Sequence, residues 1–277
     1  MHLATRIIHV VTGGGAGTPL RVATHGAGAP VVFLHGLFGL NDHWLGALRH
    51  FDHQIRCEMV EIPLLDLPGD DCSICGATAL IIRFLDSVIG VPAVLLGNSF
   101  GGHVALRVAL ERPDLVSALV LAGASGISEN NGIHDFTTRP TRAWIRTRLA
   151  ELFHDPVHIR DDEIERLHDA VNQRPYARAL LRLSRSIRQD HLGARLGGIR
   201  APSLLVWGRQ DRITPPEVAR QFAAGLPGSR IAWIDDCGHA PMIEQPRRFA
   251  QEVLAFATAV ADGVPQAATG LACAGTS

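Results

Sequence analysis

A serine flanked by glycines stands where a run of strand-forming residues gives way to a helical pattern. The serine is Ser99, in the stretch 97–101 with the sequence Gly-Asn-Ser-Phe-Gly, directly after the apolar run 92–96. A strand that turns sharply into a helix strains the residue at its tip and exposes that residue's side chain. The small residues Gly97, Gly101 and Gly102 leave room for such a turn. We therefore predict that Ser99 is a nucleophile at the start of a helix over 100–111.

Short apolar runs alternate with helical patterns around this turn. The runs have the length of buried strands and lie at 31–34, 57–62, 92–96 and 116–121. Helical spacing covers 77–88 and 100–111. This alternation is typical of a mainly parallel central sheet with helices on both faces, so the predicted fold class is α/β.

The pattern changes between Gly123 and Pro202. The segment 124–201 is rich in arginine and acidic residues, has no strand-like run and predicts three or four amphipathic helices. Strand patterns return at 203–207 and 230–234, and a last helix is expected over 241–261. We predict a core domain of residues 1–123 and 202–261, interrupted by a helical cap over 124–201, with a frayed tail over 262–277.

One predicted cap helix, over 174–187, is strongly amphipathic. Its apolar residues share one face, and four arginines occupy the other: Arg174, Arg178, Arg182 and Arg185. These arginines either cover an anionic substrate or form a solvated outer face. We favour the outer face, because long charged side chains usually point into solvent.

A serine hydroxyl needs an adjacent base to act as a nucleophile at neutral pH. Among fourteen histidines, the best candidate is His239, in the loop 235–241 that follows the last apolar strand. Loops at the carboxyl ends of parallel strands are where such sheets carry their sites. For His103, in the first turn of the helix after Ser99, we expect packing or exposure to solvent. For His35, beside a glycine in an earlier loop, we expect a structural role.

The third member of the site should be a carboxylate that orients the imidazole. Folds with this turn place nucleophile, acid and histidine in that order along the chain. Asp211 fits, because it leaves the strand pattern 203–207 in the loop 208–215. Asp235 and Asp236 are the alternatives, although their closeness to His239 in sequence favours a role in shaping its loop.

An oxyanion formed during acyl transfer needs two backbone N–H donors. Phe100, directly after the nucleophile, is predicted to supply the first. The second should come from the loop that follows the strand 31–34, with the sequence His-Gly-Leu-Phe-Gly at 35–39. We nominate Leu37.

Composition excludes several classes of function. The net charge of −1 offers no general attraction for nucleic acid or an anionic membrane, so a small-molecule substrate is expected. All basic residues are arginine, which excludes a lysine Schiff base or P-loop lysine. No leader or membrane-spanning run is recognisable, and five scattered cysteines suggest reduced thiols, so the predicted location is the cytoplasm. The pair Cys72 and Cys75 lacks a second pair at zinc-site spacing, and neither a cofactor nor a metal is predicted.

These motifs together resemble the α/β-hydrolase superfamily: His35-Gly36, the turn at Ser99, the loop at Asp211 and Cys-Gly-His ending at His239. The resemblance extends over about residues 5 to 261. It implies a mainly parallel central sheet, a helical cap inserted after the sixth main strand and a site between cap and sheet.

Within that superfamily, Gly-Asn-Ser-Phe-Gly-Gly at 97–102 and Cys-Gly-His at 237–239 are similar to carbon–carbon hydrolases of meta-cleavage products. The chain departs from them at 35–39, where they have HGxGPG, and at Ala240, where they have an aromatic residue. The serine nucleophile argues against haloalkane dehalogenase and epoxide hydrolase chemistry, which needs a carboxylate.

The expected reaction is therefore hydrolysis of a small carboxylic ester or lactone through an acyl-enzyme on Ser99. The first alternative is hydrolysis of a carbon–carbon bond in a vinylogous diketone. The second is a ligand receptor that keeps the fold and the site with little turnover.

Overall fold

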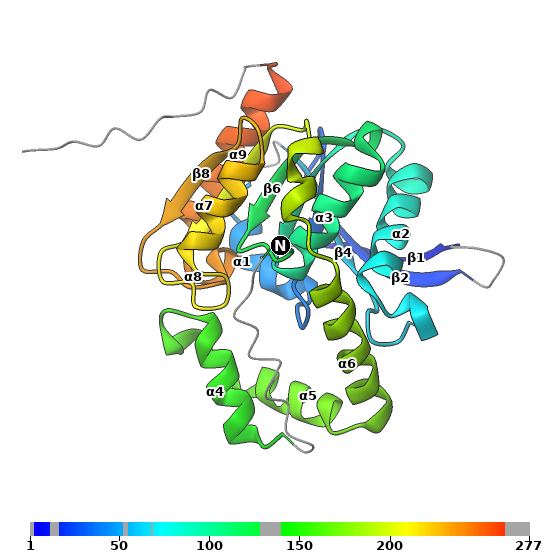
Figure 1. Ribbon diagram of the computed structural model, residues 1–277, viewed down its shortest axis with the longest axis vertical. Coiled ribbons are helices and arrows are strands. Elements are labelled where there is room, and N and C mark those ends of the chain that lie inside the picture. Colours follow the sequence, from blue (N-terminus) through cyan, green and yellow to red (C-terminus); the bar gives the residue numbers. More distant parts are fainter. Residues whose placement is uncertain (1–2, 12–16, 52–54, 68, 128–139, 264–277) are drawn as a thin grey trace, which may run out of the picture.

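The computed structural model describes residues 3–11, 17–51, 55–67, 69–127 and 140–263. Within these ranges an eight-stranded sheet has the order β1-β2-β4-β3-β5-β6-β7-β8 (Figure 1). β1 and β2 pair antiparallel, β2 also pairs antiparallel with β4, and the neighbours from β4 to β8 pair in parallel. The strands are β1 (Ala4–Val10), β2 (Thr18–His25), β3 (Pro30–Leu34), β4 (Arg56–Glu61), β5 (Ala93–Asn98), β6 (Val116–Ala122), β7 (Ser203–Gly208) and β8 (Arg230–Ile234).

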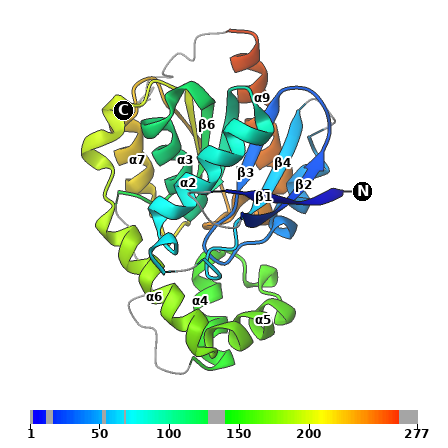
Figure 2. The same cartoon turned by 90° about the vertical axis from the view of Figure 1, so that its right-hand side faces the viewer.

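Helices cover both faces of this sheet, each above its own apolar core (Figures 1 and 2). α2 (Ile74–Phe84), α3 (Phe100–Glu111) and α7 (Pro216–Gly225) bury Phe84, Leu106 and Phe222 against one face. On the other face α1 (Leu45–Leu48) and α9 (Pro246–Ala261) pack together, and Phe249 stacks near Trp44. The predicted α/β-hydrolase architecture, with a mainly parallel sheet, is confirmed.

The last helix is broken, in contrast to the continuous helix expected over 241–261. A short α8 (Pro241–Glu244) is followed by Gln245, with φ −130° and ψ 55°, and then by α9. Pro246 explains the break, because proline disfavours helical geometry in the residue before it and has no N–H to donate. The break leaves Glu244 at the end of α8, close to the loop that carries His239.

Among the described residues between β6 and β7, the α-helices are α4 (Arg142–Leu152), α5 (Asp161–Val171) and α6 (Arg174–Gln189). Figures 1 and 2 show α4 and α5 at one end of the sheet, with α6 running from them back to the core. They share an apolar cluster of Ile145, Leu149, Ile164, Leu167, Val171 and Leu180. The domain boundaries at 123/124 and 201/202 stay a prediction, and residues 264–277 of the predicted tail lie outside the described residues.

The amphipathic helix α6 buries its apolar face, with Leu180, Leu183 and Ile187 in contact with the interior. The four arginines named above are exposed: Arg174, Arg178, Arg182 and Arg185. This arrangement agrees with the favoured interpretation, a solvated outer face. None of the helices in the described part of the chain is long and apolar enough to cross a membrane.

Candidate active site

Ser99 stands at the turn between β5 and α3, with φ 52° and ψ −116°. A positive φ is uncommon for a residue other than glycine and stores strain. The flanking glycines are required by space: a Cβ on Gly97 would lie 2.3 Å from the Gly101 carbonyl oxygen, and one on Gly101 would lie 2.0 Å from that of Leu34. The Ser99 N–H donates to the carbonyl of Ala122 on β6 at 3.0 Å, which fixes the turn to the neighbouring strand.

His239 and Asp211 form a buried hydrogen-bonded pair. His239 Nδ1 lies 2.9 Å from Asp211 Oδ2, and the two residues are 4% and 3% exposed. The Asp211 carboxylate also accepts hydrogen bonds from the N–H groups of Ile213 and Thr214 and from the Thr214 hydroxyl, each at 2.9 Å. In this position the carboxylate accepts a hydrogen bond from Nδ1–H, which leaves Nε2 of the imidazole as the basic nitrogen.

The two alternative acids lie elsewhere. Asp235 is an exposed side chain paired with Arg209 at 2.6 Å. The Asp236 side chain is 82% exposed and lies 3.9 Å from His154 Nε2. The structure therefore brings Asp211, rather than either neighbour in sequence, to His239.

The two nominated oxyanion donors border the same space as Ser99. Phe100 is the first residue of α3, and the first N–H groups of a helix have no acceptor within it. Leu37 lies in a tight turn that the Gly39 N–H closes by donating to the Gly36 carbonyl at 2.9 Å. Both residues line the cavity above Ser99, where their amides could hold a developing negative charge.

Asn98 is a site residue that the sequence analysis did not single out. Its side-chain amide donates to the carbonyl of Ala122 at 3.0 Å and to that of His239 at 3.2 Å. Asn98 therefore joins the nucleophile turn, β6 and the histidine loop, and it also lines the cavity. Its position immediately before Ser99 is the sequence feature that could have identified Asn98 as a site residue.

His35 and His103 have structural contacts. His35 Nδ1 bonds the Gly36 carbonyl at 2.7 Å and its Nε2 accepts from the Ile62 N–H at 3.1 Å, while burial lowers its pKa to about 4. His103 is fully buried and contacts Asp190 at 2.9 Å, so of the two expected environments it has the packed one. Burial would raise the pKa of Asp190, but hydrogen bonds from His103 and Arg107 hold it at about 2.

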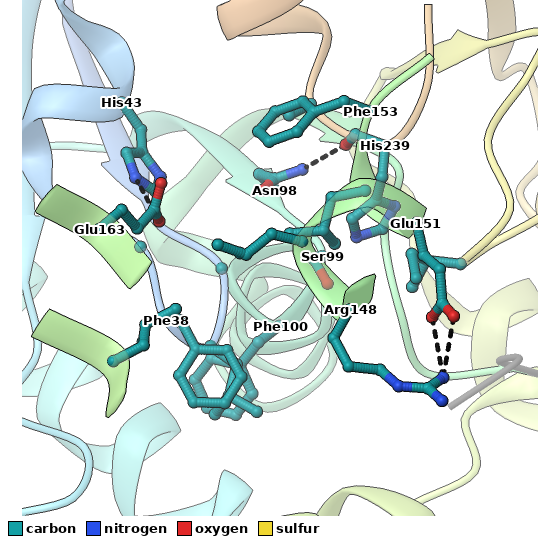
Figure 3. A pocket seen from close by; sticks show the side chains of 18 of the residues that line it. Phe38, His43, Asn98, Ser99, Phe100, Arg148, Glu151, Phe153, Glu163 and His239 are labelled. Carbon is teal, nitrogen blue, oxygen red and sulfur yellow. Dashed lines mark hydrogen bonds and ion pairs between the residues drawn. The ribbon is translucent and has the colours of Figure 1, made fainter. Parts of the chain in front are cut away.

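Ser99 and His239 open onto one cavity of about 200 Å³ between the sheet and the helices α4 and α5 (Figure 3). Its wall is largely apolar. The α4 and α5 side of the wall is formed by Trp144, Ile145, Leu149, Leu152, Phe153, Leu167 and Val171. A small, mostly nonpolar organic molecule fits such a space.

Two acid–base pairs lie at opposite ends of this cavity, with Ser99 between them (Figure 3). Arg148 and Glu151 pair at 2.9 Å, and His43 and Glu163 pair at 3.5 Å. Burial would raise the pKa of Glu163, but the contact with His43 and nearby arginine charges lower it overall. Both ends are therefore polar and carry one acid and one base each.

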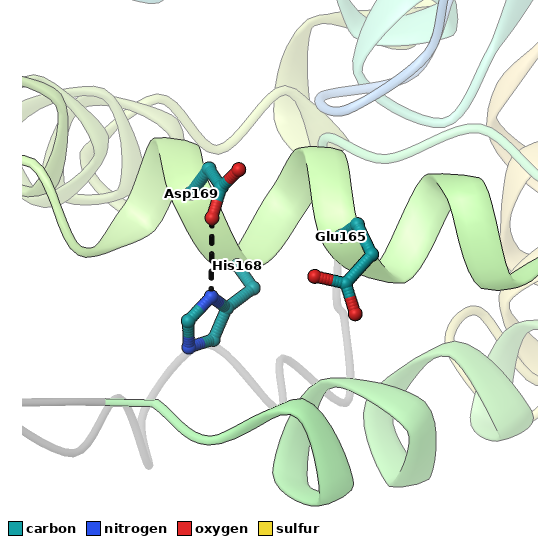
Figure 4. A group of neighbouring side chains, drawn as sticks. All are labelled: Glu165, His168 and Asp169. Carbon is teal, nitrogen blue, oxygen red and sulfur yellow. Dashed lines mark hydrogen bonds and ion pairs between the residues drawn. The ribbon is translucent and has the colours of Figure 1, made fainter.

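One cluster of potential metal ligands lies on α5, among residues that do not line this cavity (Figure 4). It consists of Glu165, His168 and Asp169, whose ligand atoms lie within 4.8 Å of one another. Glu165 is already bound by Arg142 at 2.7 and 2.8 Å, and the two carboxylates are exposed. We assign this cluster no metal-binding role.

Comparison with known proteins identifies relatives across almost the whole chain. A 2-hydroxy-6-oxononadienedioate/2-hydroxy-6-oxononatrienedioate hydrolase of Paraburkholderia phymatum is 30% identical over 289 residues, covering 91% of this chain and 95% of the relative. A hydrolase with the same description from Klebsiella pneumoniae is 32% identical over 260 residues, covering 82% and 86%.

Among solved structures, MGS-MChE2, an α/β-hydrolase enzyme from a lagoon-sediment metagenome of Mar Chica, Morocco, superposes with a TM-score of 0.71. It is 26% identical, and the match covers 91% of this chain and 98% of that one. Residues 31–252 match the alpha/beta hydrolase family. That range contains the turn at Ser99, the buried pair at Asp211 and His239, and the helices between them, and the chain belongs to the α/β-hydrolase family.

Proposed function

We propose that this protein is a serine hydrolase in which Ser99 attacks a carbonyl carbon, His239 acts as general base and Asp211 orients His239. The observation that carries the proposal is the buried 2.9 Å bond between His239 and Asp211 beside the strained serine turn. His239 Nε2 takes the hydroxyl proton, and the amides of Leu37 and Phe100 stabilise the oxyanion. His239 then protonates the leaving group, and a water activated by His239 releases the acyl group.

We further propose that the preferred substrate carries a carbon–carbon bond next to the attacked carbonyl, as in a vinylogous 1,5-diketone acid. The support is the likeness to hydrolases of oxo-dienedioates over nearly the full chain. A cavity with polar groups at both ends and the nucleophile between them also suits an elongated substrate with polar ends. This proposal places carbon–carbon hydrolysis ahead of the ester hydrolysis expected from sequence.

Cleavage of that bond leaves a carbanion, which a second conjugated carbonyl must stabilise as an enolate. His239 can deliver the proton that the enolate takes up, and water supplies hydroxide to the acyl group. The net reaction adds one water across the carbon–carbon bond and yields a carboxylic acid and a ketone-bearing acid. Neither oxidant nor reductant is required.

Hydrolysis of a small carboxylic ester is the second candidate. Each acidic side chain at the cavity ends already has a basic side chain as its partner, and the remaining wall is largely apolar, which suits a neutral acyl ester. The departures at 35–39 and at Ala240 from the carbon–carbon hydrolase pattern also favour it.

The deciding experiment compares wild type with Ser99→Ala on a vinylogous diketone acid and on p-nitrophenyl esters from acetyl to dodecanoyl. Preferred cleavage of the diketone acid, abolished in the variant, supports the proposal. Preferred Ser99-dependent ester turnover moves the esterase to first place. Covalent labelling of Ser99 by a fluorophosphonate without turnover of either substrate supports the receptor. The absence of both labelling and turnover would refute the serine mechanism.

A further inference from the structure

Glu244 is a buried carboxylate that the reaction described above does not use. It lies at the end of α8, five residues after His239 in the sequence, and is 7% exposed. A buried carboxylate is costly unless donors satisfy both of its oxygens. Its partners therefore indicate what it holds in place.

The two oxygens of Glu244 bind two different segments. Oε1 accepts from the Gly238 N–H at 2.7 Å and faces the Cys237 thiol at 3.8 Å. Oε2 accepts from the N–H groups of His154 and Asp155 at 2.6 and 3.3 Å. One carboxylate thus joins the loop that carries His239 to the segment that follows α4.

Both segments belong to the candidate active site. Gly238 directly precedes His239, while Leu152 and Phe153 directly precede His154 and line the cavity. The two segments also touch without Glu244, because the His239 N–H donates to the Leu152 carbonyl at 2.7 Å.

The His239 loop and the segment after α4 pack tightly at this contact. A Cβ on Gly238 would lie 2.6 Å from the Leu152 carbonyl oxygen and 2.9 Å from the His154 nitrogen. Burial and the neighbouring Glu244 carboxylate raise the pKa of the Cys237 thiol, which keeps that thiol neutral as a weak donor. The loop and the cavity wall therefore meet as one packed unit.

We infer that Glu244 is a positioning residue: it sets the loop of His239 and the cavity wall at Leu152 and Phe153 in one fixed arrangement, so that base and substrate face Ser99 together. This inference rests on the proposed roles of Ser99 and His239. A carboxylate suits the task because it accepts charge-assisted hydrogen bonds through both oxygens, whereas a carboxamide accepts through one and presents N–H groups on the other side.

The test is Glu244→Gln, which keeps the shape and places an NH₂ group against either the Gly238 or the His154 N–H. The matched control is Glu58→Gln on β4. Glu58 is also buried, at 3% exposure, and binds Thr24 and Arg6, but it does not line the cavity. Both variants remove a buried carboxylate, so both are expected to lower the Tm.

Only Glu244→Gln should also lower kcat, by about 10- to 100-fold, for the substrate that wild type cleaves through Ser99. Its KM should stay within about threefold of the wild-type value. Its rate of fluorophosphonate labelling at Ser99 should fall in parallel. Hydrogen exchange should rise together at 152–155 and 237–239 in Glu244→Gln and stay unchanged there in Glu58→Gln.

A Glu244→Gln variant with wild-type kcat and labelling rate overturns the inference, as does an equal loss of kcat in Glu58→Gln. Failure of the proposed function has a different signature, because wild type itself would then show neither turnover nor labelling. In that case the exchange measurement still decides the structural part: unchanged protection at 152–155 and 237–239 in Glu244→Gln overturns the link between the two segments.

Discussion

The backbone of Gly123 lies directly against the imidazole of His239. A Cβ built on Gly123 would stand 2.9 Å from His239 Nδ1 and 3.1 Å from Asp211 Oδ2. Gly123 follows β6 with φ 52°, a conformation that glycine adopts without strain. Position 123, directly after β6, therefore lies so close to the histidine–aspartate pair that only glycine fits there.

Gly123→Ala is expected to lower kcat/KM by about 100-fold or more, because the new methyl group displaces His239 or Asp211 from their contact. It should also lower the free energy of unfolding by about 1 to 3 kcal/mol through the strained φ. Turnover of the wild-type substrate and urea unfolding measure the two effects.

Gly228→Ala is the control for backbone strain alone, because Gly228 has φ 71° and a Cβ added to it would meet none of the described residues within 4 Å. It should lose stability and keep activity. Equal activity in the two alanine variants would show that Gly123 has no special relation to the pair.

Asp211→Asn tests the orientation of His239. The amide NH₂ of asparagine would face either Nδ1–H of His239 or the N–H groups of Ile213 and Thr214, so one set of bonds must be lost. We expect kcat to fall by about 10⁴-fold, which is the loss seen when the equivalent aspartate of a serine protease is changed to asparagine. Asp235→Asn, at the exposed alternative acid, should keep kcat within about twofold of wild type. The reverse ranking of the two variants would identify Asp235 as the orienting acid.

Local sequence patterns were sufficient to predict the serine turn and the alternation of strands and helices. A sharp turn leaves no room for side chains beside the nucleophile, so glycines on both sides of Ser99 predict such a turn. The structure agrees, because a Cβ on Gly101 would lie 2.0 Å from the Leu34 carbonyl oxygen. Asp211 was favoured over Asp235 because it leaves the strand pattern 203–207 in a loop of its own, whereas Asp235 is only four residues from His239. Pro246 alone would have predicted the break between α8 and α9. The apolar periodicity continues across it, however, and favoured one continuous helix over 241–261.

Contacts between distant segments could not be predicted. The bonds from Glu244 to His154 span ninety residues, and the contact of His103 with Asp190 spans eighty-seven. A single glutamate or histidine carries no local sign of such a partner, because the partner is set by how the helices between β6 and β7 fold back onto the sheet. The polar ends of the cavity, at Arg148 and His43, were missed for the same reason.

Protonation of His35 should make the protein less stable in mild acid. The pKa of His35 is lowered from 6.5 to about 4, first by burial and further by the charges of His43 and Arg166. Above pH 6.5 the residue is neutral in both states, and its contribution to stability is complete. Between pH 6.5 and 4 the unfolded chain binds the proton and the folded chain does not, so about 3 kcal/mol of stability is lost.

His35→Gln should flatten this part of the pH dependence, because a carboxamide can still donate to the Gly36 carbonyl and accept from the Ile62 N–H without titrating. Urea unfolding from pH 7 to pH 4 provides the measurement. The exposed His9 offers a control, since His9→Gln should keep the wild-type slope. An unchanged slope in His35→Gln would assign the acid sensitivity to other groups.

Arg148 is expected to distinguish anionic from neutral substrates. Its guanidinium borders the cavity and pairs with Glu151 at 2.9 and 3.1 Å, so a substrate carboxylate would compete with Glu151 for it. Arg148→Leu should therefore raise KM for a diketone acid by about tenfold, since one charge-assisted contact is lost, and change KM for a neutral ester by less than about twofold. Glu151→Gln should shift KM for the acid in the opposite direction.

The matched control for Arg148 lies on the same helix. Arg146 is exposed, pairs with Asp161 and does not line the cavity, so Arg146→Leu removes an equal charge from α4 without touching the substrate. Steady-state kinetics on both substrates should separate the two variants. If both variants raise KM for the acid equally, the effect comes from the overall charge of α4. If Arg148→Leu impairs the neutral ester as much as the acid, Arg148 supports the cavity wall and does not bind the carboxylate.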